Sequence, residues 1–185
     1  MLTEEDHFRG LPADLDRVAP AGLPRLRKDF LLDESMVIEG LLWGADAVLL
    51  LACVLEGPRL GELRAVAREL GIAALVEVHD DEELERALLV EPDLVGVNAR
   101  DLTTFTIDLA TIERLIPEVP ERFVRVAESG IATVSDQLPS VWTPRPRACH
   151  DGRAVVEPKP SATISSIGSA TRKRESGLST ARPGS

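Results

Sequence analysis

The sequence contains few cysteines, histidines and aromatic residues, and these shortages exclude several kinds of protein. Its 185 residues include two cysteines, three histidines and no tyrosine, and aromatic residues make up 3% of the chain. Cys53 lies in an apolar run and Cys149 in a stretch rich in proline and arginine, so the two do not form a disulfide framework and a reducing, cytoplasmic compartment is expected. His7, His79 and Cys149 show no spacing typical of metal ligands. Neither a glycine-rich phosphate loop nor a dinucleotide-binding motif is present.

Long apolar segments are absent as well. No run reaches about 18 apolar residues, so no membrane span is expected. The acidic residues 1–6 do not resemble a signal peptide. The length suits one domain with a sizeable core. The hydrophobic fraction of 44% and the charged fraction of 28% are ordinary for a soluble globular protein.

The net charge of −10 is distributed unevenly along the chain. Residues 1–137 carry 13 basic and 28 acidic side chains, whereas residues 138–185 carry eight basic and three acidic ones. An acidic body argues against nucleic-acid binding. The basic C-terminal stretch could bind an acidic partner, but a solvated, disordered tail is the favoured interpretation.

Apolar runs and helical patterns alternate along the first three quarters of the chain. Five apolar runs are typical of strands covered on both faces, and they span residues 23–30, 47–55, 73–78, 94–98 and 123–128. Four helical patterns lie between them, at residues 34–43, 59–70, 81–90 and 109–116. Gly71 is placed to end one helix, and Asp80 and Asp108 are placed to cap the next two. This alternation predicts successive right-handed βαβ units.

The pattern stops near Gln137. A fifth helix begins at residues 133–136, but repeated prolines interrupt every helical pattern beyond it. Serine, threonine, glycine, arginine and proline dominate to the end, and such a composition buries too little apolar area to offset the entropy of ordering. We therefore divide the chain into a β/α domain at residues 1–137 and a low-complexity, disordered tail at residues 138–185.

Two charged residues lie at the ends of predicted strands. Lys28 lies with Arg27 in the first predicted strand, and burial would make such a lysine a candidate general acid or Schiff-base nucleophile. Glu77 lies between two valines, where a carboxylate is costly unless it is paired or faces a polar cavity. Taken separately, Lys28 could be a surface lysine, and Glu77 could lie on a solvated face of its strand.

The next two strands also end in polar residues. Asn98 can orient a hydroxyl or carbonyl group, and Arg100 can bind a carboxylate or phosphate. Glu128 is followed by Ser129-Gly130, whose backbone amides could face an anion. A common loop and a simple turn explain the same residues. Together, however, four of the five predicted strands end in reactive side chains, and in β/α barrels the carboxyl ends of the strands carry the active site.

These motifs resemble the indole-3-glycerol phosphate synthase family over residues 1–136. The resemblance rests on Leu26–Phe30, Gly44–Leu50, Ala74–His79, Gly96–Leu102 and Glu128–Ile131. It implies a (β/α)8 TIM-type barrel that needs no metal or organic cofactor. It also implies a carbon–carbon carboxy-lyase of tryptophan biosynthesis. That lyase closes the ring of a small sugar phosphate, 1-(2-carboxyphenylamino)-1-deoxyribulose 5-phosphate, to indole-3-glycerol phosphate with loss of carbon dioxide and water.

The resemblance also implies roles for individual residues. Lys28 matches the family's general acid at the ribulose carbonyl, and Glu77 matches a glutamate that transfers protons. Asn98 matches an asparagine that holds the substrate, and Arg100 an arginine that supports the polar site. Glu128 matches a glutamate beside the reacting centre.

Three further residues are implied to bind the substrate. Ser129 and Gly130 match the wall on the phosphate side, and Phe30 matches the lining of the anthranilate pocket.

The chain departs from the family pattern at both ends. The family's first strand carries a Glu-x-Lys motif followed by a serine-rich phosphate loop, and its eighth strand carries a Gly-x-Ser phosphate motif; neither is found here. We therefore expect an incomplete (β/α)8 barrel, truncated at both ends, with strands three to seven and a remnant of the second near residues 2–4. The change of composition near Gln137 suggests a frame-shifted coding sequence.

An incomplete barrel leaves sheet edges exposed, which gives three interpretations of function. The first is a synthase whose activity is impaired by the missing first and eighth strands. The second is a non-catalytic fragment that associates with itself or with a partner through its open edges. The third is another phosphate-binding β/α barrel of tryptophan or histidine synthesis, which the Leu26–Phe30 motif disfavours. No nucleic acid or membrane is expected as a partner.

Overall fold

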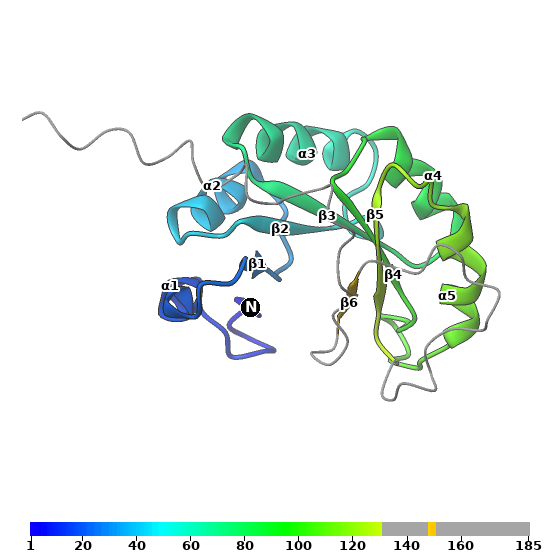
Figure 1. The fold of residues 1–185 in the computed structure, drawn as a ribbon, viewed down its shortest axis with the longest axis horizontal. Coiled ribbons are helices and arrows are strands. Elements are labelled where there is room, and N and C mark those ends of the chain that lie inside the picture. Colours follow the sequence, from blue (N-terminus) through cyan, green and yellow to red (C-terminus); the bar gives the residue numbers. More distant parts are fainter. Residues whose placement is uncertain (131–147, 151–185) are drawn as a thin grey trace, which may run out of the picture.

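The chain folds into one sheet of six parallel strands with helices packed on its outer face (Figure 1). A computed structural model describes residues 1–130 and 148–150. The strands follow one another across the sheet in sequence order and are β1 (Leu26–Arg27), β2 (Ala47–Leu51), β3 (Ala73–Val78), β4 (Leu94–Asn98), β5 (Val124–Glu128) and β6 (Ala148–His150). The helices are α1 (Ala13–Arg17), α2 (Glu34–Leu42), α3 (Arg59–Leu70), α4 (Asp81–Leu89) and α5 (Leu109–Leu115), with short 3₁₀ segments η1 (Ala19–Ala21) and η2 (Ile116–Glu118). Among these described helices, none is long and apolar enough to cross a membrane.

The predicted α/β class is confirmed, as is the alternation of strands and helices. Helices α2, α3, α4 and α5 lie within one residue of their predicted bounds. The strands differ more at their ends: β1 covers only Leu26–Arg27 of the predicted run 23–30, and β2 ends at Leu51 because the chain turns at the following residues. Apolar composition alone does not mark the point where ladder pairing stops. Helix α1 was not predicted.

The helix ends are fixed by the residues that the sequence indicated. The Asp80 carboxylate accepts a hydrogen bond from the backbone N–H of Glu83 at 2.8 Å, and that of Asp108 accepts one from Ala110 at 3.0 Å. Both side chains thereby satisfy amides that have no partner within the helix. Gly71 ends α3 with φ of 73°, a left-handed conformation in which glycine carries no steric cost. These caps set where each helix begins or ends, and so where the strand-end loops begin.

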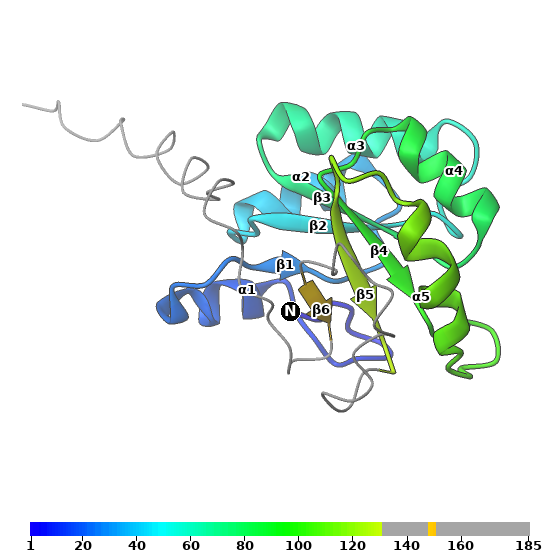
Figure 2. The same cartoon turned by 45° about the vertical axis from the view of Figure 1, so that its right-hand side comes forward.

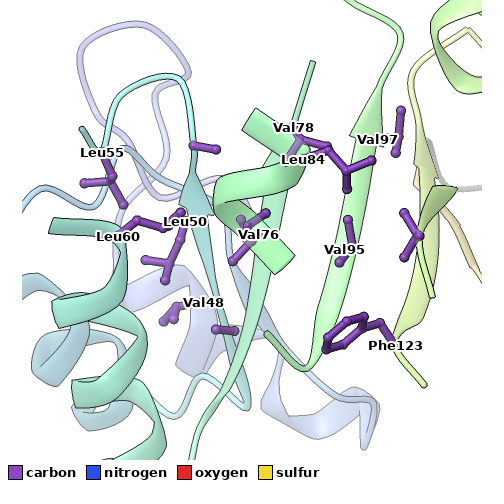
Figure 3. Packing of buried hydrophobic residues seen from close by; sticks show 14 of the residues in the cluster. Val48, Leu50, Leu55, Leu60, Val76, Val78, Leu84, Val95, Val97 and Phe123 are labelled. Carbon is purple, nitrogen blue, oxygen red and sulfur yellow. The ribbon is translucent and has the colours of Figure 1, made fainter. Parts of the chain in front are cut away.

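The sheet has two faces with different roles, because successive side chains in a strand point in opposite directions. On the outer face, β-branched and leucine side chains of β2, β3 and β4 pack against the helices and form the main core (Figure 3). The residues labelled there include Val48, Leu50, Val76, Val78, Val95, Val97, Leu55, Leu60, Leu84 and Phe123. A smaller cluster of Leu49, Leu51, Leu75 and Val126 lies on the inner face. The helices cover the outer face (Figures 1 and 2), so the inner face carries this small cluster and the polar residues described below.

The predicted remnant of a second family strand is found beside β1. Leu2 forms an isolated parallel bridge with Lys28. The N–H of Lys28 donates to the Met1 carbonyl at 2.9 Å, and the N–H of Thr3 donates to the Lys28 carbonyl at 3.1 Å. This short pairing covers part of the edge that β1 would otherwise expose.

The opposite edge is partly covered as well. Strand β6 pairs in parallel with β5, with Val126, Ala127 and Glu128 opposite residues 148–150. These three residues belong to the stretch predicted as a disordered tail, and their pairing covers part of the edge that β5 would otherwise expose. The remainder of that predicted tail, and the helix predicted to begin at residues 133–136, lie outside the described residues.

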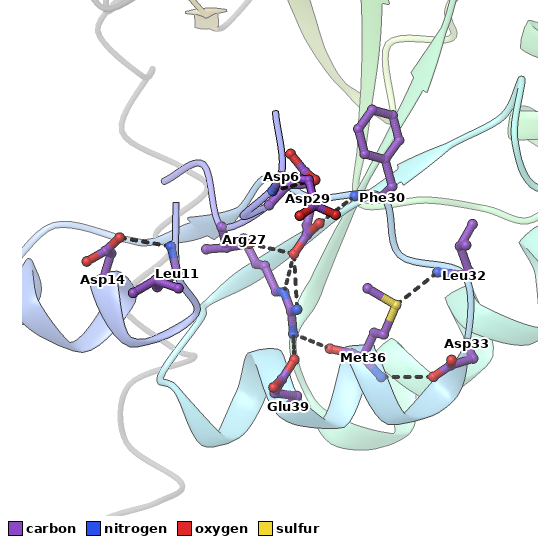
Figure 4. A network of polar contacts seen from close by, with 12 residues as sticks. Asp6, Leu11, Asp14, Arg27, Asp29, Phe30, Leu32, Asp33, Met36 and Glu39 are labelled. Atoms are coloured by element: carbon purple, nitrogen blue, oxygen red, sulfur yellow. Dashed lines mark hydrogen bonds and ion pairs between the residues drawn. The ribbon is translucent and has the colours of Figure 1, made fainter. Parts of the chain in front are cut away.

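The buried arginine of β1 is held by an ionic network rather than by the site (Figure 4). Arg27 is 2% exposed, and its guanidinium contacts the carboxylates of Asp29 at 3.1 Å and of Glu39 at 2.8 Å and donates to the Met36 carbonyl at 2.7 Å. Gly40 makes room for it, because a Cβ atom there would lie 3.2 Å from Cδ of Arg27. Arg27 therefore joins β1 to α2 and fixes the strand that carries Lys28.

Candidate active site

Four polar side chains from four elements meet on the inner face of the sheet. Glu77, Asn98 and Glu128 lie on β3, β4 and β5, and Lys28 directly follows β1. Each occupies the same face as the inner apolar residues of its strand, two or four positions away. The apolar cluster thus forms a floor, and the polar residues lie above it at the carboxyl ends of the strands.

Lys28 stands between two carboxylates. Its Nζ lies 3.1 Å from Oε2 of Glu77 and 3.4 Å from Oε2 of Glu128, and it donates a hydrogen bond to each. The flanking elements β1 and β5 are four strands apart in the sheet, a separation of roughly 19 Å if the sheet were flat. Contact between Lys28 and Glu128 therefore requires the sheet to curl around its inner face, as in a barrel.

Asn98 orients the first carboxylate. Its amide Nδ2 donates to Oε1 of Glu77 at 2.8 Å, and its Oδ1 accepts a hydrogen bond from the backbone N–H of Arg100 at 3.0 Å. Because both ends of the amide are engaged, the donor group is directed at Glu77. Asn98 is buried, so this arrangement is shielded from water.

Glu128 occupies space that a glycine leaves free. An added Cβ at Gly96 would lie 2.1 Å from Oε1 of Glu128, so any side chain at position 96 would require the Glu128 carboxyl group to move. Glu128 is 2% exposed, and its Oε1 has no hydrogen-bond partner among the described residues. A buried carboxyl oxygen without a donor favours the protonated form of the group.

The environment moves the pKa values of the two glutamates in opposite directions. Burial raises the pKa of Glu128 to about 8, and the nearby charge of Glu77 adds to this while Lys28 opposes it. Burial would also raise the pKa of Glu77, but the nearby His79, the charge of Lys28 and the hydrogen bond from Asn98 outweigh it and hold that pKa well below its usual range. Near neutral pH the site accordingly holds one ionised and one protonated carboxyl group, the condition for dividing base and acid roles.

The lysine stays charged in this setting. Burial alone would lower the pKa of Lys28, but the charges of Glu128 and Glu77 and their hydrogen bonds outweigh burial and raise it. A cationic ammonium with two buried acceptors can donate a hydrogen bond or a proton to an oxygen that develops negative charge.

His79 is a member of this network that the sequence analysis did not assign to the site. Its Nε2 lies 3.4 Å from Oε1 of Glu77, and its Nδ1 lies 3.0 Å from Oε2 of Glu83. Burial would lower the pKa of His79, but contacts with Cys53, Glu77 and Glu83 raise it to about 11. Its position directly after the strand residue Val78 was the available signal, since side chains following a parallel strand gather at the same edge.

A cavity of about 450 Å³ opens next to this network. The predicted residues Asn98 and Arg100 line it, together with residues after β2 and β3 and in the loop after β4, namely Cys53, His79, Asp80, Glu83, Ala99, Asp101, Leu102, Thr103, Thr106, Asp108 and Thr111. Lys28, Glu77 and Glu128 are not among the lining residues, and Asn98 connects the cavity to them through its hydrogen bond to Glu77. The cavity is large enough for a small organic molecule.

The residues predicted to bind substrate come shortly after the strands β1, β4 and β5. Phe30 is 39% exposed and follows β1, where its ring points away from the Arg27 network (Figure 4). Ser129 and Gly130 form the turn after β5 with φ of 67° and 77°. Gly130 is needed there, because a Cβ would lie 2.6 Å from Ile107. Within the described part of the chain, neither Arg100 nor Ser129 hydrogen-bonds through its side chain to the lysine–glutamate group.

Three possible metal ligands also lie together beside the site. Cys53, His79 and Glu83 each place a ligand atom within 4.8 Å of the others. Sequence spacing did not reveal this group, because the cysteine is contributed by a different strand end from the other two.

Comparison with known proteins gives a consistent result. The family model described as indole-3-glycerol phosphate synthase matches residues 1–140. The indole-3-glycerol phosphate synthase of Chromobacterium violaceum is 49% identical over 137 residues, which are 74% of this chain and 52% of that protein. Indole-3-glycerol phosphate synthase 1 of Streptomyces coelicolor is 47% identical over 139 residues, or 75% and 52% of the two chains. Indole-3-glycerol phosphate synthase 2 of Ralstonia nicotianae is 44% identical over 139 residues, again 75% and 52%. The chain spans about half the length of these curated relatives.

Proposed function

Because this chain belongs to the indole-3-glycerol phosphate synthase family, we propose that its site performs the family's ring closure. The substrate would be 1-(2-carboxyphenylamino)-1-deoxyribulose 5-phosphate, a small sugar phosphate, and the product indole-3-glycerol phosphate. The observation that carries the proposal is the contact of Lys28 with both Glu77 and Glu128 at 3.1 and 3.4 Å. We place this step in tryptophan biosynthesis in the cytosol, with no part for nucleic acid, membrane, metal or organic cofactor.

In the proposed mechanism, Lys28 and Glu128 donate protons and Glu77 accepts one. The Lys28 ammonium donates a proton to the ribulose carbonyl oxygen as the aromatic carbon attacks the carbonyl carbon. Loss of carbon dioxide then returns the bonding electrons to the ring. The remaining hydroxyl leaves as water when it takes a proton from Glu128, whose pKa near 8 keeps it protonated at neutral pH. Glu77 accepts the proton that leaves the ring carbon next to the nitrogen, so that the double bond of the indole forms, and can pass it back to Lys28. Asn98 holds the Glu77 carboxylate in place.

We assign the proposed substrate-binding roles to residues that come shortly after β1, β4 and β5. Arg100 lines the cavity next to Asn98 and supplies a positive charge for an anionic group of the substrate. The exposed ring of Phe30 offers an apolar surface to the anthranilate ring. Ser129 and Gly130 turn at the end of β5 and would present backbone amides to the phosphate side.

We further propose that the 185-residue chain, assayed by itself, turns over slowly. It matches about half of its relatives' length, and precise placement of the substrate accounts for much of an enzyme's rate. The test is a steady-state assay of indole-3-glycerol phosphate formation with the purified chain and with a full-length relative. If neither the chain nor its Lys28→Met variant formed product, the proposed catalytic function of the chain would be contradicted. Turnover equal to that of the full-length relative would contradict the proposal that the chain is slow.

A second function rests on a different observation, the incompletely paired β1 edge. Among the described residues, the short pairing of residues 1–3 with Lys28 covers this edge, and Met1, Leu2 and Leu23 beside it are 44%, 42% and 71% exposed. We propose that the chain associates with itself or with a partner through this edge. Sedimentation velocity across a range of concentrations tests self-association, and a monomer at all concentrations would contradict it.

A further inference from the structure

A second group of ionisable side chains lies on the other side of His79 from Glu77. Cys53 is two residues beyond β2, His79 is one residue beyond β3, and Glu83 is in the first turn of α4. From these residues we propose a binding site for a thiophilic divalent cation such as Zn²⁺, formed by Cys53 Sγ, a ring nitrogen of His79 and a carboxylate oxygen of Glu83. The proposal does not require the proposed ring closure to be correct.

The strand register explains why the three residues meet. Leu51 and Glu77 are direct partners across β2 and β3, so Cys53 and His79 both lie two residues beyond the same rung of the ladder. The Asp80 cap then starts α4 at once and brings Glu83 back over His79, whose backbone N–H donates to Glu83 at 2.8 Å. The cluster is thus fixed by backbone pairing on two sides and by a helix cap on the third.

The donor atoms suit a metal ion in kind and in spacing. Thiolate, imidazole and carboxylate are the ordinary ligands of Zn²⁺, and around a tetrahedral ion such atoms lie roughly 3.3–3.7 Å apart. Here Nδ1 of His79 lies 3.0 Å from Oε2 of Glu83, and all three ligand atoms lie within 4.8 Å. A shift of about 1 Å would suffice, and the exposed Cys53 side chain is free to provide it.

The second nitrogen of His79 provides independent support. Nε2 is buried and has no hydrogen-bond partner among the described residues, but it faces Oε1 of Glu77 at 3.4 Å. When one nitrogen of a histidine binds a metal, the other characteristically donates to a carboxylate, which fixes the ring. Glu77 is therefore already placed to accept a hydrogen bond from Nε2 of a ring that binds an ion through Nδ1.

The surrounding charge also favours a cation. Glu77 and Glu83 flank His79, and the acidic residues Asp80 and Asp101 line the adjoining cavity. Ligation displaces a proton from the imidazole and from the thiol, and the ion supplies the positive charge that the two carboxylates then hold. Three protein ligands leave the fourth position open toward the cavity of about 450 Å³, where water or an anionic group could bind.

The experiment must separate ion binding from a purely structural pairing of two of the three residues. Glu83 and His79 could pair only to cap α4, in which case Cys53 contributes nothing. The decisive variant is therefore Cys53→Ser, with Cys149→Ser on β6 as the matched control, since it removes the chain's other thiol. Serine is close in size to cysteine, and Cys53 is exposed, so the variant should fold, which circular dichroism can verify.

The measurement is titration of the purified 185-residue chain with ZnCl₂ under reducing conditions, by calorimetry and by competition with a chromophoric chelator. We expect one saturable site, an affinity at least about tenfold lower in Cys53→Ser, and no change in Cys149→Ser. Titration with Co²⁺ should give a thiolate-to-metal charge-transfer band that Cys53→Ser abolishes. Absence of a one-to-one site in the micromolar range, or equal affinity in the unsubstituted chain and Cys53→Ser, would overturn the proposal. None of these readouts depends on catalysis, so they fail or succeed separately from the proposed ring closure.

Discussion

Lys28 and Glu128 lie 3.4 Å apart, Nζ to Oε2, although 100 residues separate them along the chain. They come from the first and fifth strands of the sheet, so their contact measures how far the sheet curls. It also places the Lys28 ammonium against a carboxyl group whose pKa burial raises to about 8. Changes to this pair and to the residues around it should therefore alter turnover, stability and the pH dependence of stability.

Removing the lysine charge should affect both turnover and stability. In Lys28→Met the carboxyl groups of Glu77 and Glu128 lose their shared cation, and we expect the free energy of unfolding to fall by about 1–3 kcal/mol. Turnover, measured as indole-3-glycerol phosphate formation, should fall by about 10²–10⁴-fold because a positioned general acid is lost. Lys28→Arg keeps the charge but releases no proton near neutral pH, so it should recover stability and not turnover. Unchanged urea unfolding in Lys28→Met would contradict the buried ion pair.

A methyl group at position 96 should disrupt the placement of Glu128. The Cβ of Gly96→Ala would lie 2.1 Å from Oε1 of Glu128, so the carboxyl group must move, and we expect a loss of about 1–3 kcal/mol in stability. The matched control is Gly61→Ala in α3, where the nearest atom is Val90 Cγ1 at an ordinary 3.6 Å. That control should gain up to about 1 kcal/mol from helix propensity. Chemical denaturation compares the two, and equal stability changes would show that Glu128 does not occupy this space.

Stability should depend on pH through Glu128. Its pKa rises from an ordinary value near 4.3 in the unfolded chain to about 8 in the folded one, so the folded state binds the extra proton between these values. The stability contributed by the protonated form is therefore complete below about pH 4 and is lost as pH rises toward 8, at a rate of at most about 1.4 kcal/mol per pH unit. Glu128→Gln, which is always neutral, should show a smaller loss over the same range. Parallel unfolding curves for the two chains between about pH 5 and 8 would contradict the raised pKa.

Breaking the buried Arg27 network should lower stability more than breaking the exposed ion pair of Arg17 and Asp14. Asp29 accepts hydrogen bonds from the Thr3 hydroxyl at 2.8 Å, from the Arg27 guanidinium at 3.1 Å and from the Phe30 amide at 2.9 Å. Asp29→Ala leaves a buried guanidinium short of one partner, and we expect a loss of about 3 kcal/mol. Arg17→Ala breaks the exposed pair with Asp14 and should cost less than about 1 kcal/mol. Thermal or urea unfolding would separate the two, and similar losses would mean that burial adds nothing to the Arg27 network.

Much of the fold could be predicted because its signals are local. The boundaries of α3 and α4 follow from the apolar spacing of their residues and from Gly71 and Asp80, which act within one turn of the helix. The family resemblance over residues 26–30 and 96–102 also held, and membership of this family sets aside the other phosphate-binding barrels. Strand ends were predicted less well, since a strand ends where its neighbour ceases to pair, as Leu51 does at the rung of Glu77.

The candidate site, too, could be predicted only in part from the sequence. The sequence by itself identified Lys28, Glu77, Asn98 and Glu128, because a polar residue at the end of an apolar run is visible without coordinates. Only the tertiary structure brought Lys28 within 3.4 Å of Glu128, left Glu128 over Gly96 and joined Cys53 to His79. The physical reason is that hydrogen-bonded local patterns specify each strand and helix, whereas pKa values and ligand clusters depend on burial and on distances between segments that meet only when the sheet curls.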